Sequence, residues 1–265
     1  MSSILKIFKN NRFSAAAVSE KGDVRKINQD NFYVAGHRKT DPDEENISYD
    51  LNTGEKQLLC AVFDGMGGET DGEIASFIAA NKMAELPEGQ FDNAESIVSG
   101  YESLNSAVME YSSGNIEGNC GTTAVVLSLS SKYAQVSNIG DSAAYLMRGG
   151  RLKKLSHDHS IFQQYADMGM RLEGNAGRNL LTQFVGLDPR ELPVEPYIAD
   201  KTELEPGDIF LLCSDGVCGV LTPEDIALTL IEKTEVHEKA EKLVRLSYEK
   251  GSRDNATAVV VAFKN

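Results

Sequence analysis

Two apolar runs in this chain stop abruptly at the dipeptide Asp-Gly. The first run, residues 58–63, ends at Asp64, and the second, residues 209–214, ends at Asp215. A short apolar run bounded by turn residues indicates a buried strand. An aspartate at the point where such a strand leaves the core projects its carboxylate into the adjoining cleft. The sequence therefore predicts acidic groups at the ends of buried strands.

Two further aspartates fit the same plan. Asp141 follows the strand-like residues 136–140, and Asp254 precedes the strand-like run 256–263. Several acids at strand ends, far apart in the sequence, suggest one oxygen-rich metal site, whereas a single acid would be a turn former. Oxygen-only ligands favour Mg²⁺ or Mn²⁺ over zinc or copper. Two such ions can share a carboxylate and a water, which generates a nucleophile for in-line attack on a phosphoester.

Asp64 opens the glycine-dense stretch 64–68. This stretch lacks the Lys-Ser/Thr of a P-loop and the spacing of a dinucleotide-binding motif. Glycine allows the backbone to approach a ligand closely, so Gly65 is a candidate to offer its carbonyl to a hard cation. The alternative is a tight turn between a strand and a helix.

Hydrophobic periodicity predicts many antiparallel strands and two pairs of helices in one domain spanning residues 1–265. The fold class is therefore α+β, a layered sandwich of antiparallel strands and helices. Four strands in quick succession across residues 122–155 predict an antiparallel meander, and charged residues 37–56 predict an exposed hairpin excursion. Thr222 followed by Pro223 predicts a helix start. The first long helix is expected to begin at Asp71 or Glu69.

Composition limits the partners and the compartment. The net charge of −14 and the lack of a Lys/Arg stripe argue against nucleic acid. Hydrophobic residues make up 41% of the chain, enough for a sizeable core, but no apolar stretch is long enough for a membrane span. The four cysteines have no metal-site spacing, so a cytoplasmic protein with reduced thiols is expected. Residues 1–12 are a peripheral segment, either a frayed terminus or a weak amphipathic surface helix.

Six motifs occur in an order that resembles the metal-dependent serine/threonine phosphatases of type 2C, the PPM family. The resemblance extends over residues 14–263, and residues 178–183 look like the bacterial branch of the family. The motifs are Arg25-x-x-Asn28-Gln29-Asp30, Asp64-Gly65-Met66-Gly67-Gly68, Gly121-Thr122-Thr123, Gly140-Asp141-Ser142, Ser214-Asp215-Gly216-Val217 and Asp254-Asn255-x-Thr257.

This resemblance implies a four-layer α-β-β-α sandwich, in which two antiparallel sheets pack face to face between helix pairs. It also implies a two-metal centre at one end of that sandwich. Asp64 would bridge both ions, Gly65 would give its carbonyl to one of them, and Asp215 and Asp254 would hold the other. Asp141, together with Asp215, would form the third, weaker site of bacterial relatives.

The resemblance also implies roles for residues that do not ligate metal. Asp30 would hydrogen-bond water molecules on the ions, and Arg25 would bind the substrate phosphate, for which its planar fork is suited. Thr122, Thr123 and Asn255 would shape the site.

Simpler interpretations stand beside these roles. Arg25 could be an ordinary surface arginine, and Asp30 and Asp141 could be turn or cap residues. The Gly-Thr-Thr segment is equally explained by strand packing. His157 and His159 are two positions apart, so they are not neighbours on a helix face. They are interpreted as a loop–helix boundary, with contact to substrate as the alternative.

The chain departs from the family pattern at two positions. Met66 stands where animal relatives have a histidine that protonates the leaving group, and methionine has no proton to donate. Bacterial members commonly have methionine there. Ala143 replaces the arginine that usually follows Gly-Asp-Ser, which alters the surroundings of the third metal site. Residues 157–190 correspond to the family's flap, and residues 161–179 within it look short and glycine-rich.

The sequence thus predicts a metal-dependent phosphoprotein phosphatase that hydrolyses phosphoserine and phosphothreonine with two Mn²⁺ or Mg²⁺ ions. Expected partners are phosphoproteins, in opposition to a serine/threonine kinase, and the expected oligomeric state is a monomer. One alternative is a weakly active or inactive family member that serves as a regulatory binding module. Another is a phosphatase for small molecules or for a transcription-regulator partner.

Overall fold

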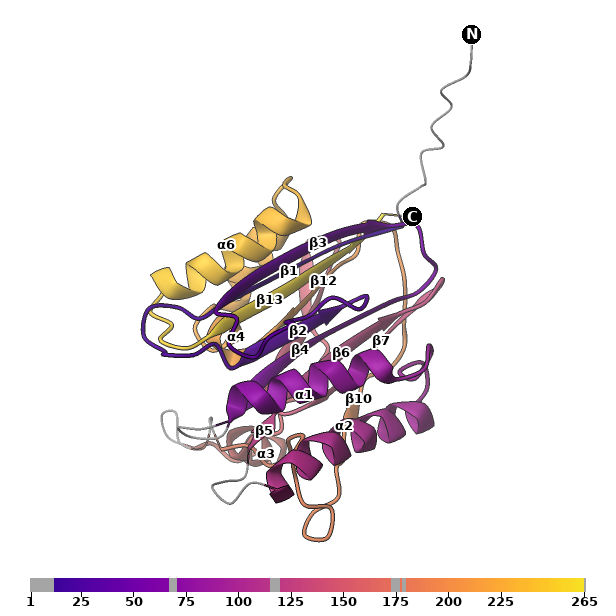
Figure 1. Ribbon diagram of the computed structural model, residues 1–265. Helices are drawn as coiled ribbons and strands as arrows, with labels where there is room; N and C mark the ends of the chain where they lie inside the picture. The colour runs from indigo at the N-terminus through magenta and orange to yellow at the C-terminus, as the bar shows by residue number, and fades with distance from the viewer. Residues whose placement is uncertain (1–11, 67–70, 115–119, 173–176, 178–179, 265) are drawn as a thin grey trace.

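The computed structural model describes residues 12–66, 71–114, 120–172, 177 and 180–264 (Figure 1). Most of the N-terminal segment 1–12 lies outside these residues, as do Glu69, Gly67, Gly68, Arg178 and Asn179. Within the described part of the chain, the strands form a six-stranded and a seven-stranded sheet.

The first sheet is antiparallel and contains both ends of the described chain. Strand β1 lies between β3 and β13, with residue-by-residue register along both neighbours. The strands, in their order across the sheet, are β3 (Asn46–Thr53), β1 (Phe13–Glu20), β13 (Ala256–Phe263), β12 (Ile209–Cys213), β8 (Ala143–Arg148) and β9 (Arg151–Lys154).

The second sheet is built from the middle of the chain. Its main path is β10 (Tyr197–Ile198), β7 (Tyr133–Ile139), β6 (Ala124–Leu129), β4 (Leu58–Met66) and β2 (Asp30–Val34). Two short strands join it outside this path: β11 (Thr202–Glu203) pairs with β7, and β5 (Gly121–Thr122) pairs with β4.

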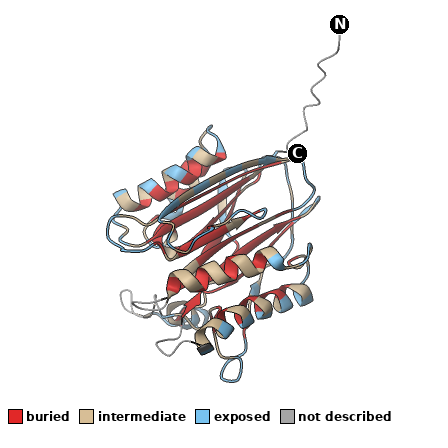
Figure 2. Ribbon diagram, in the orientation of Figure 1, coloured by how far each residue is buried: buried red, intermediate tan, exposed pale blue. Residues whose placement is uncertain are grey.

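Helices cover the outer face of each sheet, as Figure 1 shows. Helices α1 (Gly72–Glu85) and α2 (Ala94–Gly114) pack on the second sheet, and α4 (Asp215–Cys218), α5 (Pro223–Leu230) and α6 (Val236–Glu249) pack on the first. A buried apolar cluster fills the space between the sheets, and another lies under each helical layer. Figure 2 shows the resulting buried stripe along the helices. The predicted four-layer α-β-β-α sandwich is confirmed.

The prediction of an exposed hairpin excursion at residues 37–56 is wrong for its second half. Residues 46–53 form the edge strand β3, and all eight of them pair with β1. Their exposure alternates along the strand, and Ile47, Tyr49 and Leu51 pack against the central core. This period of two is the pattern of a half-buried strand, which the high charge of the segment obscured.

The predicted meander of four consecutive strands is also wrong. Strands β6 and β7 pair in the second sheet, but β8 and β9 pair in the first. The turn at Gly140 and Asp141 therefore carries the chain from one sheet to the other. Gly140 has a φ of +93°, a conformation that side-chain-bearing residues rarely adopt.

The helix starts follow their predicted signals. Thr222 and Asp225 form a reciprocal capping box with Pro223 in the first turn of α5. Asp71 occupies the N-cap position of α1, although its side chain makes no capping hydrogen bond. Helix α3 (Ile161–Asp167) begins at the cap Ser160, so His157 and His159 precede it, consistent with the loop–helix boundary. Within the described ranges, every helix falls short of the length and apolar character needed to cross a membrane.

Candidate metal centre

Four aspartates from distant parts of the chain line one pocket of about 240 Å³. Asp64 lies near the end of β4, and Asp141 lies in the turn from β7 to β8. Asp215 opens α4 immediately after β12, and Asp254 lies just before β13. Because the strands pack as a sandwich, their ends bring these four carboxylates to the same end of the molecule, where Figure 1 also shows α3, α4 and β5.

Burial and neighbouring carboxylates raise the pKa values of three of these aspartates, Asp64, Asp141 and Asp215. Burial is the largest cause of the raised pKa of Asp64, and the nearby charges of Asp30 and the other three pocket aspartates add to it. Burial also raises the pKa of Asp141 to about 7, with a contribution from Asp215. The pKa of Asp215 is raised by burial and by Asp254. Concentrated negative charge of this kind is stabilised by bound cations.

The Gly-Thr-Thr segment fixes the backbone at Asp64. The Thr123 backbone N–H donates to the Asp64 carbonyl (2.8 Å), and the Thr123 hydroxyl accepts from the Asp64 N–H (3.0 Å). The Thr122 hydroxyl donates to the same carbonyl (3.0 Å). Thr123 also shares a hydrogen bond with Ser142, which follows Asp141 (2.6 Å). The two threonines thus hold both aspartates in place through the backbone and a hydroxyl.

Gly65 occupies a position with no room for a side chain. A Cβ there would lie 2.0 Å from the carbonyl oxygen of Gly72 and 2.6 Å from that of Gln29. The Gly65 N–H donates to the Gln29 carbonyl (3.1 Å). This close approach clamps β4 between α1 and the loop before β2, beside the pocket that Gly65 itself lines.

Asp30 lies behind the pocket and pairs in register with Asp64. One of its carboxylate oxygens accepts hydrogen bonds from Ser214 and Thr257, each 2.7 Å long. Burial raises the pKa of Asp30 to about 7, while these two hydrogen bonds lower it. Asp30 therefore ties the ends of β12 and β13 to β2, and its predicted bond to metal-bound water stays a prediction.

Arg25 lines the same pocket from an irregular loop and is exposed. Its guanidinium forms an ion pair with Asp254 (Nη2 to Oδ2, 2.5 Å). The guanidinium charge also lowers the pKa of Asp215. A planar, permanently charged fork at the pocket mouth suits the binding of a phosphate group.

The donor chemistry of the pocket fits hard divalent cations. Among the residues that the structure describes, no three His, Cys, Asp or Glu side chains are placed to hold one ion as they stand. The Asp254 carboxylate is instead paired with the Arg25 guanidinium. Mg²⁺ and comparable ions are commonly held by only one or two carboxylates and retain water for the rest. Four carboxylates and a backbone carbonyl are therefore a suitable set of oxygen donors.

A larger pocket of about 560 Å³ adjoins the metal centre and shares Asp141 and Asp215 with it. Lys154 and Asp158, which form an ion pair (2.6 Å), lie in its wall together with residues of the predicted flap. His159 accepts a hydrogen bond from the Gly140 N–H (3.2 Å), and the His157 ring lies 2.8 Å from Asp167. Neither histidine lines either pocket.

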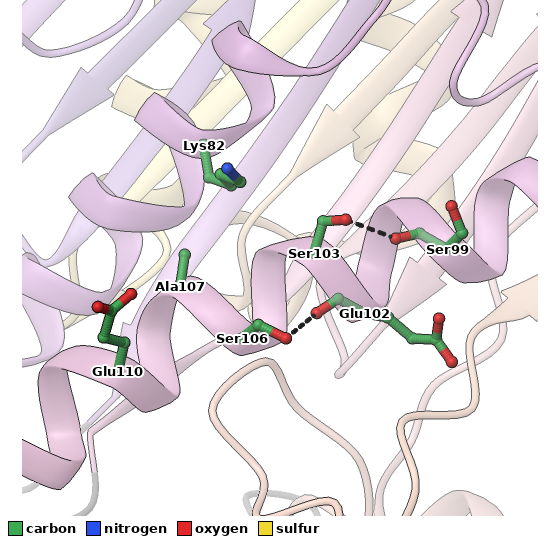
Figure 3. A pocket seen from close by; sticks show the side chains of 7 residues that line it. All are labelled: Lys82, Ser99, Glu102, Ser103, Ser106, Ala107 and Glu110. Atoms are coloured by element: carbon green, nitrogen blue, oxygen red, sulfur yellow. Dashed lines mark hydrogen bonds between the residues drawn. The ribbon is translucent and has the colours of Figure 1, made fainter.

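Another hollow of about 500 Å³ lies between α1 and α2 (Figure 3). Its serines are engaged with their own helix: Ser103 donates to the Ser99 carbonyl and Ser106 to the Glu102 carbonyl, both at 2.8 Å. In Figure 3 the charged side chains of Lys82, Glu102 and Glu110 are spread along the rim rather than gathered at one point. This hollow lacks the convergent polar groups of a reactive site.

The structure adds residues that sequence reasoning did not assign. Gln29 and Leu181 line the metal pocket, and both fall inside motifs that the sequence displayed. Ser214 bonds Asp30 and lies next to Asp215, so its place in the Ser-Asp-Gly motif was a usable signal. Lys39 is buried behind the loop of Arg25, and nothing in its charged surroundings distinguished it in the sequence.

Comparison with known proteins identifies the family. The profile of the family described as protein phosphatase 2C matches residues 33–165, half of the chain. The chain belongs to this family. The serine/threonine protein phosphatase PstP of Mycobacterium tuberculosis is 30% identical over 249 residues, which are 92% of this chain and 44% of PstP. Protein phosphatase PhpP of Streptococcus pneumoniae is 27% identical, over 86% of this chain and 94% of PhpP.

A solved structure supports the same assignment. The catalytic domain of PstP, in complex with two manganese ions, is 27% identical to this chain and superposes with a TM-score of 0.75. The alignment covers 96% of this protein phosphatase 2C family chain and 100% of that domain. The chain spans less than half the length of full PstP, 44% of it.

Proposed function

We propose that the chain is a metal-dependent serine/threonine protein phosphatase. The observation that carries this proposal is the meeting of Asp64, Asp141, Asp215 and Asp254 in one pocket with Arg25. Family membership and the names of the relatives PstP and PhpP support it. The substrate class is phosphoserine and phosphothreonine in proteins.

Asp64, Gly65, Asp215 and Asp254 would hold two ions, Mn²⁺ or Mg²⁺, with Asp141 and Asp215 at a third, weaker position. The two manganese ions bound to PstP support the pair of sites. When bound, such ions activate water for in-line attack on phosphorus and neutralise charge that develops on the phosphoryl oxygens.

The residues of the chain itself perform three tasks. Arg25 binds the phosphate oxygens, and its ion pair with Asp254 places the guanidinium over the pocket. Thr122 and Thr123 fix the backbone of Asp64. Asp30, held by Ser214 and Thr257, keeps three strand ends in register and would orient water on the ions.

The wider biological setting is part of the same proposal. The phosphoprotein substrates would be those of an opposing serine/threonine kinase, and the protein would act as a monomer in the cytoplasm. Four cysteines that are free in the structure support a reducing compartment. The regulatory-module alternative is disfavoured because every predicted carboxylate ligand reaches the pocket.

The decisive experiment measures hydrolysis of a phosphoserine peptide and of a generic aryl phosphate with Mn²⁺, with a chelator, and in Asp215→Asn. Both removal of metal and the substitution should lower kcat/KM by about a hundredfold or more, because each removes cations that supply several kcal/mol. Asp158→Asn, which changes a charge in the adjoining pocket, is the matched control and should retain most activity. Hydrolysis that survives both chelation and Asp215→Asn would refute the proposal.

A further inference from the structure

The loop that carries Arg25 has little regular structure of its own. Residues 21–29 form turns and bends between β1 and β2, so their position depends on contacts with other segments. Asn255 supplies one set of these contacts: its side-chain amide donates to the carbonyls of Lys21 and Ile27 and accepts from the Gln29 N–H, at 2.9–3.0 Å.

Lys39 supplies contacts on another side of the loop. Its ammonium donates to the Asn28 carbonyl (2.7 Å), and its backbone N–H donates to the Asn31 side chain (3.1 Å). Lys39 and Asn28 are each only 1% exposed. Burial lowers the pKa of Lys39 to about 8, although the charges of Asp30 and Glu44 oppose this shift. A lysine is rarely buried so completely unless its ammonium is paired.

Asn28, whose carbonyl Lys39 holds, is followed by Gln29, which contacts Gly65 in the wall of the candidate metal pocket. Gln29 accepts the Gly65 N–H through its own carbonyl (3.1 Å). The fit between Gln29 and Gly65 is so close that a Cβ on Gly65 would lie 2.6 Å from that carbonyl. A shift of Asn28 is therefore passed to Gly65 in one direction and to Arg25 in the other.

We propose that Lys39 is a positioning residue for the metal centre. Its buried ammonium fixes the Asn28 carbonyl and so sets the places of Arg25 and Gly65, without touching substrate. Removal of the ammonium leaves a buried carbonyl unpaired, an unfavourable state that is relieved when the loop moves. The kinetic part of this proposal rests on the proposed phosphatase activity, and the structural part does not.

The test compares Lys39→Met with Lys239→Met. Lys239 is a second buried lysine, 3% exposed, whose ammonium donates to the Glu232 carbonyl beyond α5. Both substitutions delete a buried charge that is bonded to one backbone carbonyl, but Lys239 belongs to α6 and does not line the metal pocket. Lys39→Arg, which retains an N–H donor, serves as the conservative variant, and Lys39→Gln replaces Lys39→Met if the latter does not fold.

Three readouts are measured on the folded variants: KM and kcat for an aryl phosphate, Mn²⁺ affinity by calorimetry, and amide hydrogen exchange without metal. In Lys39→Met we expect KM to rise about tenfold with a much smaller change in kcat. A small displacement of a group that orients the substrate reduces catalytic efficiency by about this factor or more. Mn²⁺ affinity should fall by at least about threefold, and exchange should accelerate in residues 22–30. Lys39→Arg should recover part of each change, and Lys239→Met should alter none of the three at the site.

Two outcomes would overturn the proposal. One is a folded Lys39→Met protein whose KM, Mn²⁺ affinity and exchange in residues 22–30 all stay within about twofold of wild type. The other is an equal effect of Lys239→Met, which would reveal a general loss of stability. If the wild-type protein hydrolyses no phosphoester, the phosphatase proposal fails, and the calorimetry and exchange data still decide the role of Lys39.

Discussion

The candidate metal centre contains several carboxylates that repel one another and one arginine that is paired with them. Asp64, Asp141 and Asp215 all have raised pKa values because burial and neighbouring carboxylates disfavour their ionised forms. Arg25 is the cation that the structure places against this group, through its ion pair with Asp254. The same guanidinium therefore balances the carboxylates and, in the proposed function, would present donors to a phosphate.

Arg25→Met should raise KM for a phosphoester about tenfold or more and leave kcat less affected. A hydrogen bond to a charged group contributes about 1.5–3 kcal/mol, and in the proposed role Arg25 would bond the phosphate in the ground state as well as in the transition state. The KM of Arg25→Lys should lie between those of wild type and Arg25→Met, since a lysine retains the charge but lacks the planar fork of donors. Steady-state kinetics and inhibition by inorganic phosphate measure the effect. The control is Arg253→Met, an exposed arginine beside Asp254, and an equal rise in KM there would contradict the role of Arg25.

Elements bring these residues together through very close backbone contacts. Helix α4 lies against the segment that contains Asp254, and Gly216 makes that contact possible. A Cβ on Gly216 would lie 1.8 Å from the Asn255 carbonyl oxygen. The Asp-Gly pairs of the two apolar runs thus have a shared physical reason: the aspartate faces the pocket and the glycine admits a neighbouring backbone.

Gly216→Ala should lower the free energy of unfolding by about 3 kcal/mol or more, because an overlap with backbone cannot be relieved by a side-chain rotation. It should also weaken Mn²⁺ binding, since Asp215 and Asp254 flank the contact. Gly207→Ala is the matched control. Gly207 has a φ of +92° and open space around it, so alanine there should cost only about 1–2 kcal/mol. Urea unfolding of the metal-free proteins measures both, and equal costs would show that the contact is not tight.

The stability of the protein at low pH should depend on the hydrogen bonds and the ion pair at the start of α5. Asp225 accepts hydrogen bonds from Thr222 and forms an ion pair with Lys250 (2.6 Å). The Lys250 bond, followed by those of Thr222, lowers the pKa of Asp225 from 3.8 to about 2. An acid whose pKa is lower in the folded state stabilises the fold above its unfolded pKa and loses that contribution as pH falls.

Asp225→Asn should therefore lower the thermal midpoint at pH 5–7, and the difference from wild type should shrink as pH falls from about 4 toward 2. Thermal scans at several pH values measure this difference. The control is Glu224→Gln, which removes a charge from the same helical turn but leaves the capping box intact. If the difference in thermal midpoint between Asp225→Asn and wild type stays constant down to pH 2, the ion pair and the capping box do not cause it.

How well the sequence predicts these elements depends on how local their signals are. The runs that became β4, β12 and β13 are continuous and apolar, and the Thr222-Pro223 cap is a local signal, so all were predictable. Whether β7 and β8 share a sheet depends on the course of the turn at Gly140, where a Cβ would lie 2.6 Å from the Thr123 side chain, and no local pattern shows this contact. The burial of Lys39 likewise results from long-range packing, whereas the four pocket aspartates stood at recognisable strand ends.

At the scale of the whole molecule, the β-sandwich keeps the pocket carboxylates close together although their charges repel one another. The buried cluster between the sheets fixes the strands, and the strand ends then have no freedom to separate the carboxylates. The fold must therefore supply stability elsewhere to tolerate the charges of the pocket. Cations that bind only the folded state should reverse this cost, so metal binding and stability are linked.

Mn²⁺ at about a hundred times its dissociation constant should stabilise the protein by about 2.7 kcal/mol. For a chain of this size, that corresponds to a rise of about 5–10 °C in the thermal midpoint. Asp64→Asn should lose most of this increment, because Asp64 is the proposed shared ligand. Without metal, the same substitution should leave the midpoint unchanged or raise it, since one of the mutually repelling charges is gone.

Asp158→Asn separates this effect from a general change in charge. Asp158 lines the adjoining pocket and pairs with Lys154, outside the proposed ligands, so the variant should keep the full Mn²⁺-dependent rise. Differential scanning calorimetry across a Mn²⁺ titration gives both quantities for each protein. A full Mn²⁺-dependent rise in Asp64→Asn would place the stabilising cations elsewhere. A metal-free midpoint that falls by several degrees would mean that the Asp64 carboxylate supports the metal-free fold, and would contradict the repulsion inferred from the raised pKa values.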